Sequence, residues 1–164
     1  MKLVTVDPGV RKCGWALFEE ERLVDCGWVI AGVAASRPQW VKTARELLAE
    51  IFRHVPSEDW EDLRFAVEQM HSRSTRKEAW ESLLEISRMT GAFGAFAYPC
   101  PVELVSPTKW TGRMKKEKHQ KRTKLLLTPE ERDIMVVTLA EAPVSAHSEV
   151  VDAIGMGLYL TGRV

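Results

Sequence analysis

The stretch that decides the fold is KLVTVDPG, residues 2–9. Its apolar, β-branched residues followed by Pro8 and Gly9 are typical of a strand that ends in a turn. Asp7 stands where this strand emerges, and open α/β sheets bind ligands in the crevice beyond the carboxyl ends of their strands. Asp7 is therefore the first candidate for a functional residue.

The remaining apolar pattern predicts an α/β fold, with a five-stranded mixed sheet flanked by helices. Short connections between the first three strands favour an antiparallel meander. The fourth strand follows a helix, so we expect it to lie parallel to the first, which makes the strand order 3-2-1-4-5. Small residues at 91–95, and Gly155 and Gly157, predict that two helices pack closely on the sheet. The expected strands are residues 2–7, 14–18, 23–30, 63–68 and 102–105, and the expected helices are residues 40–52, 79–97, 149–160 and one capped by Thr128.

The composition is that of an ordinary globular protein. The chain has 164 residues, of which 45% are hydrophobic and 28% charged, and we expect residues 1–164 to form a single domain. Its apolar runs are too short for a membrane span, and its N-terminus lacks the pattern of a signal peptide. The three cysteines are odd in number and lack metal-site spacing. We therefore expect a cytoplasmic protein with reduced thiols.

Positive charge is concentrated in one segment, KWTGRMKKEKHQKRTK at residues 109–124. It contains eight Lys or Arg residues and one Glu, a net charge of +7, so the remainder of this neutral chain carries −7. A solvated surface is the ordinary alternative, but a nearly single-signed run favours binding of a polyanion. We assign His119 to the same basic surface. The candidate DNA contacts are Lys109, Arg113, Lys115, Lys116, Lys118, Lys121 and Arg122, with a second strip at Arg73, Arg76 and Lys77.

Further acidic residues occur in apolar settings like that of Asp7. Glu68 closes the fourth strand, and parallel pairing of the first and fourth strands would place it beside Asp7. Glu149 and Asp152 are three residues apart, so they share one face of the last helix. Taken singly, such residues are commonly turn, cap or helix-terminus residues. Together they predict one acidic cluster.

A cluster of four carboxylates needs a compensating cation, because like charges a few ångströms apart oppose ionisation. Mg²⁺ and Mn²⁺ prefer carboxylate oxygen, and two such ions can hydrolyse a phosphodiester. The basic segment would then hold the phosphate backbone. The combination predicts a metal-dependent nuclease, with Asp7, Glu68, Glu149 and Asp152 as catalytic metal ligands.

The acidic motifs occur in order as DPG at 7–9 followed by GWAL at 14–17, AVEQ at 66–69 and EVVDAIG at 149–155. With SPTKW at 106–110, they make the chain resemble the RuvC-type Holliday-junction resolvases of the RNase H-like superfamily, in particular compact phage members. This resemblance implies an RNase H-like fold, two Mg²⁺ or Mn²⁺ ions, and a homodimer that resolves branched DNA in a bacterial or phage-infected cell during recombination or repair. Glu149 stands where other members often have Asp or His.

Two further expectations come from the resemblance. Many bacterial members carry an aromatic residue three positions after the second acidic residue, where it wedges into the junction. His71 occupies that position here and follows Met70, so these two residues are the candidate wedge. The helix from Ala79 to Tyr98 is the candidate dimer interface, since its apolar positions exceed one face; ordinary packing on the sheet is the alternative explanation for them.

Two alternative functions remain open. The same metal site would serve a nuclease of this superfamily that cuts flaps, replication forks or RNA–DNA hybrids, because substrate choice depends on dimer geometry and surface contacts. A non-catalytic DNA-binding module with the same fold is the second alternative. Four intact carboxylates favour an enzyme over such a module.

Overall fold

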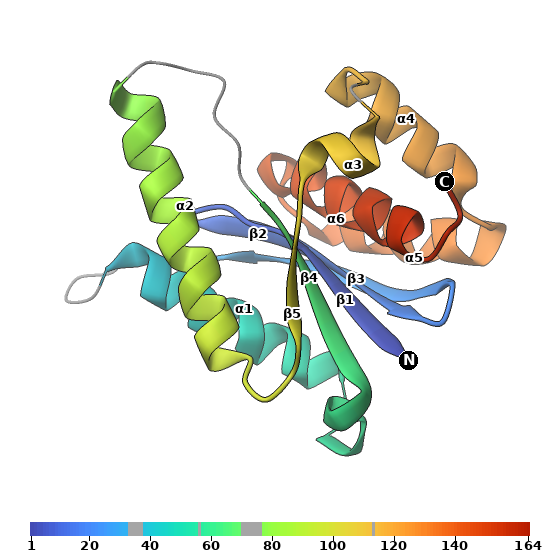
Figure 1. Cartoon of the computed structure of the whole chain (residues 1–164). Helices are drawn as coiled ribbons and strands as arrows, with labels where there is room; N and C mark the ends of the chain where they lie inside the picture. The colour runs from blue at the N-terminus through green and yellow to red at the C-terminus, as the bar shows by residue number, and fades with distance from the viewer. Residues whose placement is uncertain (33–37, 56, 70–76, 113) are drawn as a thin grey trace.

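The structure is a computed structural model that describes residues 1–32, 38–55, 57–69, 77–112 and 114–164. A mixed sheet lies between two layers of helices (Figure 1). The strands are β1 (Lys2–Asp7), β2 (Lys12–Glu19), β3 (Arg22–Ile30), β4 (Leu63–Glu68) and β5 (Val102–Val105). The helices are α1 (Gln39–His54), α2 (Lys77–Phe96), α3 (Pro107–Thr111), α4 (Lys116–Leu126), α5 (Pro129–Glu141) and α6 (His147–Leu160), with short 3-10 turns at Ser57–Asp62 and Val144–Ala146.

The strand order β3-β2-β1-β4-β5 confirms the predicted topology. The first three strands form the expected antiparallel meander, and β4 pairs parallel with both β1 and β5. The register places Val6 opposite Val67, so Asp7 and Glu68 follow at adjoining positions at the carboxyl ends of β1 and β4. The predicted juxtaposition of these two strand ends is therefore present in the backbone.

Alternation along β1 separates two hydrophobic cores. Val4 and Val6 point into the core shared with α1 and α2. Leu3 points into the core beneath α6, and the Thr5 hydroxyl donates a 2.7 Å hydrogen bond to the carbonyl of Ala153 in α6. Because side chains alternate along a strand, Asp7 lies on the α6 side of the sheet.

Glycines let α6 approach its neighbours closely. A Cβ on Gly157 would lie 2.0 Å from the ring of Phe18 on β2, which confirms that this glycine permits packing on the sheet. The same expectation for Gly155 was wrong. A Cβ there would lie 2.7 Å from both His119 Nε2 and Thr123 Oγ1, so Gly155 admits α4 instead.

Helix α2 packs on α1, with Met89 and Phe93 buried in the core below. We expected its small residues to bring it close to the sheet, and for Gly91 and Gly94 this was wrong. A Cβ on either glycine would meet no atom within 4 Å. These glycines instead line an open groove of about 390 Å³ beside Leu104 of β5.

Helices α3 and α4 occupy the basic segment and were not predicted. Their apolar signal is weak because few side chains face the core. Trp110 in α3, and His119 and Thr123 in α4, are the buried residues of these helices. The hydrophobic periodicity that indicates most helices is therefore absent from the segment.

Helix α5 begins at the predicted cap Thr128, which forms a capping box with Glu131. The buried Glu131 carboxylate also accepts hydrogen bonds from the backbone N–H of Leu23, at 2.9 Å, and from Arg163. It thus connects α5, β3 and the segment after α6.

The three cysteines are free and buried, as expected for reduced thiols. Among the described residues, no helix combines the length and hydropathy needed to cross a membrane.

Candidate active site

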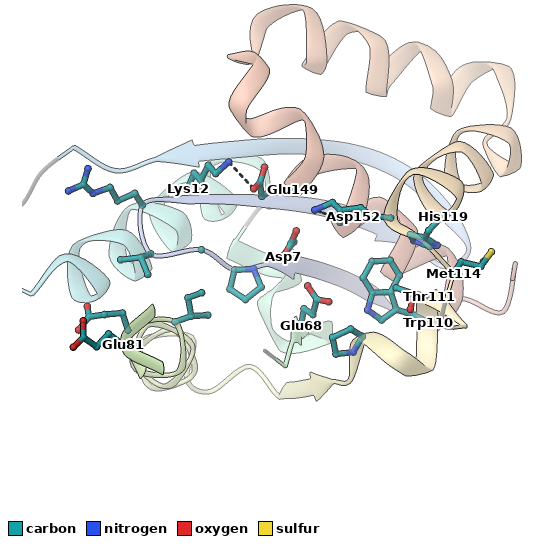
Figure 2. A pocket seen from close by; sticks show the side chains of 18 residues that line it. Asp7, Lys12, Glu68, Glu81, Trp110, Thr111, Met114, His119, Glu149 and Asp152 are labelled. Atoms are coloured by element: carbon teal, nitrogen blue, oxygen red, sulfur yellow. Dashed lines mark ion pairs between the residues drawn. The ribbon is translucent and has the colours of Figure 1, made fainter. Parts of the chain in front are cut away.

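The carboxyl ends of β1 and β4 form the floor of an open pocket of about 940 Å³. Asp7 and Glu68 project into it from these strands, while Glu149 and Asp152 line it from α6 (Figure 2). The four predicted acidic residues therefore share one pocket, although they come from three separate stretches of the chain. Two carboxylates that we did not predict, Glu81 and Glu85 on α2, line the same pocket.

Gly14 explains how α6 comes so close to the strand ends. It lies opposite Asp7 in the antiparallel register of β1 and β2. A Cβ on Gly14 would stand only 2.1 Å from the carbonyl carbon of Glu149. The absence of a side chain at Gly14 therefore allows the first turns of α6 to rest on β2 beside Asp7.

Asp7 is buried, with 8% of its surface exposed. Burial raises its pKa well above the ordinary value for a carboxyl group, because the charged form loses its hydration. The charge of Glu68 and a hydrogen bond with Glu68 raise this pKa further, and the charge of Asp152 adds to the effect. Additional positive charge in the pocket would therefore favour the ionised form of Asp7.

Glu149 is paired with a lysine from the start of β2. Lys12 Nζ lies 3.0 Å from Glu149 Oε1 and also donates a hydrogen bond to the carbonyl of Ser145 (Figure 2). The second oxygen, Oε2, is buried without a hydrogen-bond partner among the described residues. A buried carboxylate oxygen in this state is costly, and a cation would satisfy it.

Asp152 is engaged on both oxygens by α4. Lys116 Nζ lies 2.7 Å from Oδ2, and Gln120 Nε2 donates to Oδ1 at 2.9 Å. Gln120 Nε2 also donates to Ser148 Oγ at 3.0 Å. Burial opposes the charge of Lys116, but the hydrogen bond to Asp152 and the negative charges of Asp152, Asp7 and Glu149 together outweigh burial and raise the lysine pKa. Neither Lys12 nor Gln120 was a candidate from the sequence, because only the tertiary packing brings them to α6.

Within the residues that the structure describes, no three His, Cys, Asp or Glu side chains are grouped so that they could hold a metal ion as they stand. The carboxylates of Glu149 and Asp152 are instead paired with the ammonium groups of Lys12 and Lys116. The residues nevertheless fit Mg²⁺ or Mn²⁺, because these ions prefer carboxylate oxygens. Glu149 Oε2 lacks a hydrogen-bond partner among the described residues, and the raised pKa of Asp7 shows that its charged form lacks compensation, so a cation would satisfy both groups.

The predicted basic surface is present in part. Lys109, Lys115, Lys118 and Lys121 are exposed, and Arg122 is half-buried. Lys116 is exposed too, but its ammonium group faces Asp152 rather than the solvent side of α4.

The assignment of His119 to the basic surface was wrong, because it is 3% exposed and its ring lies 4.5 Å from that of Trp110. Burial lowers the pKa of His119, which favours its neutral form.

Several predicted residues cannot be placed. Lys77 begins α2, and its side chain is not described; outside the described residues lie Met70, His71, Arg73, Arg76 and Arg113.

No protein-family model matches the chain, and a search of curated proteins finds no significant relative. Solved structures do resemble it. RuvC of Thermus thermophilus is 19% identical, with a TM-score of 0.56 over 98% of this chain and 95% of that chain. The T. thermophilus RuvC complex with a Holliday junction substrate is 17% identical, with a TM-score of 0.54 over 96% and 91%.

A viral protein shows the same likeness. The Fowlpox virus resolvase, solved with its substrate Holliday junction DNA, is 13% identical, with a TM-score of 0.59 over 98% of this chain and 97% of that chain. The likeness extends over nearly the whole of each chain, and the strand order is the one predicted. The chain therefore has the RNase H-like fold that RuvC and the poxvirus resolvase share.

Proposed function

We propose that this protein is a divalent-metal-dependent endonuclease that resolves four-way DNA junctions. One observation carries the proposal: three separate elements of an RNase H-like fold bring Asp7, Glu68, Glu149 and Asp152 to one pocket. Lys116 at the start of α4 lines this pocket, and the exposed lysines further along α4 could hold the DNA backbone. The likeness in fold to two proteins solved with Holliday junction DNA supports the choice of substrate.

The four carboxylates would hold Mg²⁺ or Mn²⁺, with two ions in each site. Bound metal supplies the activation of water and the stabilisation of the leaving oxygen in phosphodiester hydrolysis. The chain contributes position: Asp7 is fixed by the strand pairing of β1, and Gln120 orients Asp152 through its 2.9 Å hydrogen bond. The lysines of α4 contribute affinity for phosphate.

We further propose that the protein acts as a homodimer. A four-way junction has approximate two-fold symmetry, so two coordinated cuts require two active sites related by a two-fold axis. Helix α2 is the candidate interface because Leu84 and Phe96 are 53% and 45% exposed on it. The open groove between α2 and β5 lies on the same part of the molecule. Light scattering of the protein with junction DNA measures the state directly, and a monomeric mass would exclude this assembly.

The function is tested by cleavage of synthetic junction, flap, duplex and RNA–DNA hybrid substrates side by side. The wild type should cut the junction with Mg²⁺ or Mn²⁺ and should not cut it with EDTA or Ca²⁺. Asp7→Asn and Asp152→Asn should abolish cleavage and leave DNA binding largely intact. Because burial and Glu68 oppose the charge of Asp7, Asp7→Asn should also keep or raise the melting temperature, which separates loss of activity from unfolding.

Each alternative has its own outcome in this experiment. Preferred cleavage of flaps or hybrids would make the protein a different nuclease of the same fold. Binding of the junction without cleavage of any substrate would make it a DNA-binding module. Cleavage that persists in EDTA would contradict the proposed metal site.

A further inference from the structure

Helix α4 places a cation against a candidate metal ligand. Lys116 Nζ lies 2.7 Å from Asp152 Oδ2, and the Asp152 side chain is 8% exposed. The other oxygen of Asp152 is bound by Gln120 of the same helix. A metal ion that binds Oδ2 on the side now taken by Lys116 would therefore replace its ammonium group.

The position of Lys116 is set by buried packing. Gly155 of α6 admits the side chains of His119 and Thr123, which are 3% and 1% exposed. The His119 ring also packs edge-on against Trp110 of α3. These contacts hold α4 against α6, and they bring its first turn, which begins at Lys116, over Asp152.

A lysine at the start of a helix is locally unfavourable, because the helix dipole places positive charge there. Lys116 is the first residue of α4, and Lys115 precedes it. The acidic pocket compensates for this placement, since Asp152 lies within ion-pair distance of Lys116. In the absence of another cation, the ion pair with Asp152 therefore stabilises Lys116 at this position.

We propose that Lys116 is an internal counter-ion of Asp152, that a divalent cation displaces it, and that the released ammonium group then binds a DNA phosphate. This inference rests on the proposed function, because it assumes that Asp152 is a metal ligand. It adds a coupling between metal binding and DNA binding in which Lys116 contributes to DNA affinity only after the metal has bound.

The exposure of the two partners decides which of them moves. The Lys116 side chain is 59% exposed, so its long aliphatic stem can turn into solvent at small cost, and ion pairs this exposed are weak. Gln120 donates to both Asp152 and Ser148, and it can keep the carboxylate oriented after Lys116 has left. Lys12 differs from Lys116, because it binds both Glu149 and the Ser145 carbonyl and is therefore anchored.

The first measurement is Mn²⁺ binding without DNA, followed by electron paramagnetic resonance or calorimetry. Lys116→Gln should lower the Kd for Mn²⁺ by about three- to tenfold, because it removes the competing charge. Lys116→Arg should bind Mn²⁺ like the wild type. Lys124→Gln is the matched control, since it removes an exposed lysine two turns further along α4. Asp152→Asn should weaken Mn²⁺ binding, which locates the bound ion.

The second measurement is junction binding with and without Ca²⁺, which permits binding without cleavage. With Ca²⁺, Lys116→Gln should weaken binding and reduce the log–log salt slope by about 0.9, the value of one phosphate contact. Without a divalent ion, Lys116→Gln should bind the junction like the wild type, because Lys116 is then held by Asp152. Thermal melting verifies that each variant is folded.

The outcomes separate this inference from the proposed function. Wild-type protein that binds no Mn²⁺ would overturn the metal site itself. Normal metal-dependent cleavage together with unchanged or weaker Mn²⁺ binding by Lys116→Gln would leave the function standing and overturn the displacement. An equal loss of junction affinity with and without Ca²⁺ would also overturn it, because Lys116 would then bind DNA independently of the metal.

Discussion

Gly14→Ala is the substitution that tests most directly how the fold builds the site. The new Cβ would lie 2.1 Å from the carbonyl carbon of Glu149 and 2.4 Å from the backbone nitrogen of Val150. Ordinary contact begins at 3.4 Å, so the closer distance falls short by about 1.3 Å. Both atoms belong to the backbone, and no side-chain rotation can relieve the clash. Helix α6 must therefore move away from β2.

Overpacking of a core typically costs 1–3 kcal/mol, and a clash with backbone belongs at the upper end, about 3 kcal/mol. In a protein of this size that cost lowers the melting temperature by roughly 6–12 °C. The displacement also moves Glu149 and Asp152 relative to Asp7. Misplacement of reacting groups by about 1 Å reduces turnover about 100-fold. Gly14→Ala should therefore lose most junction cleavage even below its melting temperature.

The assay compares thermal melting of the wild type, Gly14→Ala and Gly91→Ala, followed by cleavage at a temperature where wild type and Gly14→Ala are folded. Gly91→Ala is the stability control, because its Cβ would meet no atom within 4 Å and alanine favours a helix by about 0.5–1 kcal/mol. It should melt at or above the wild-type temperature. If Gly14→Ala melts within about 2 °C of the wild type and cleaves junctions normally, α6 does not rest on β2 as described.

Two further predictions concern α5 and the DNA-binding surface. Glu131→Gln breaks a buried ion pair with Arg163 and should lower the free energy of unfolding at pH 7 by about 3–5 kcal/mol. Burial raises the pKa of Glu131, but its hydrogen bonds, led by the one from Arg163, outweigh burial and lower it below 4.5. The pair therefore stabilises the fold above pH 4.5, and the loss of unfolding free energy in Glu131→Gln should shrink as the pH falls through the lowered pKa. Denaturant unfolding measures this loss, and a loss that stays constant from pH 7 to pH 3 would contradict the prediction. Replacing Lys115, Lys118 and Lys121 together with Ala should reduce the salt slope of junction binding by up to about 2.7, whereas an unchanged slope would make this face of α4 an ordinary solvated surface.

The sheet and its acidic residues could be predicted because they follow short-range rules. The β-branched run before Asp7 indicates a strand, and the turn after it indicates where the strand ends. Parallel pairing then places Glu68 next to Asp7, and helical spacing puts Glu149 and Asp152 on one face. Each of these steps needs only a local pattern and one topological rule. The structure confirms the strand order and places all four carboxylates in one pocket.

Helix α4 could not be predicted in the same way, because its buried contacts are made by His119 and Thr123 rather than by an apolar stripe. The contact of His119 with Gly155 depends on the packing of two helices, and no local pattern reports it. The same packing decides the partner of Lys116. A count of charges assigns this lysine to DNA, since it stands among other basic residues, whereas the structure pairs it with Asp152.

The lysines of the pocket show which part of its negative charge is already compensated. Lys12 and Lys116 face Glu149 and Asp152, so the two acids of α6 each have a positive partner. Asp7 lies beside Glu68, and its pKa is raised first by burial and then by Glu68. A divalent ion beside Asp7 would favour the ionised form of its carboxyl group, whereas we expect an ion that takes the place of Lys116 at Asp152 to bind only as this lysine is released.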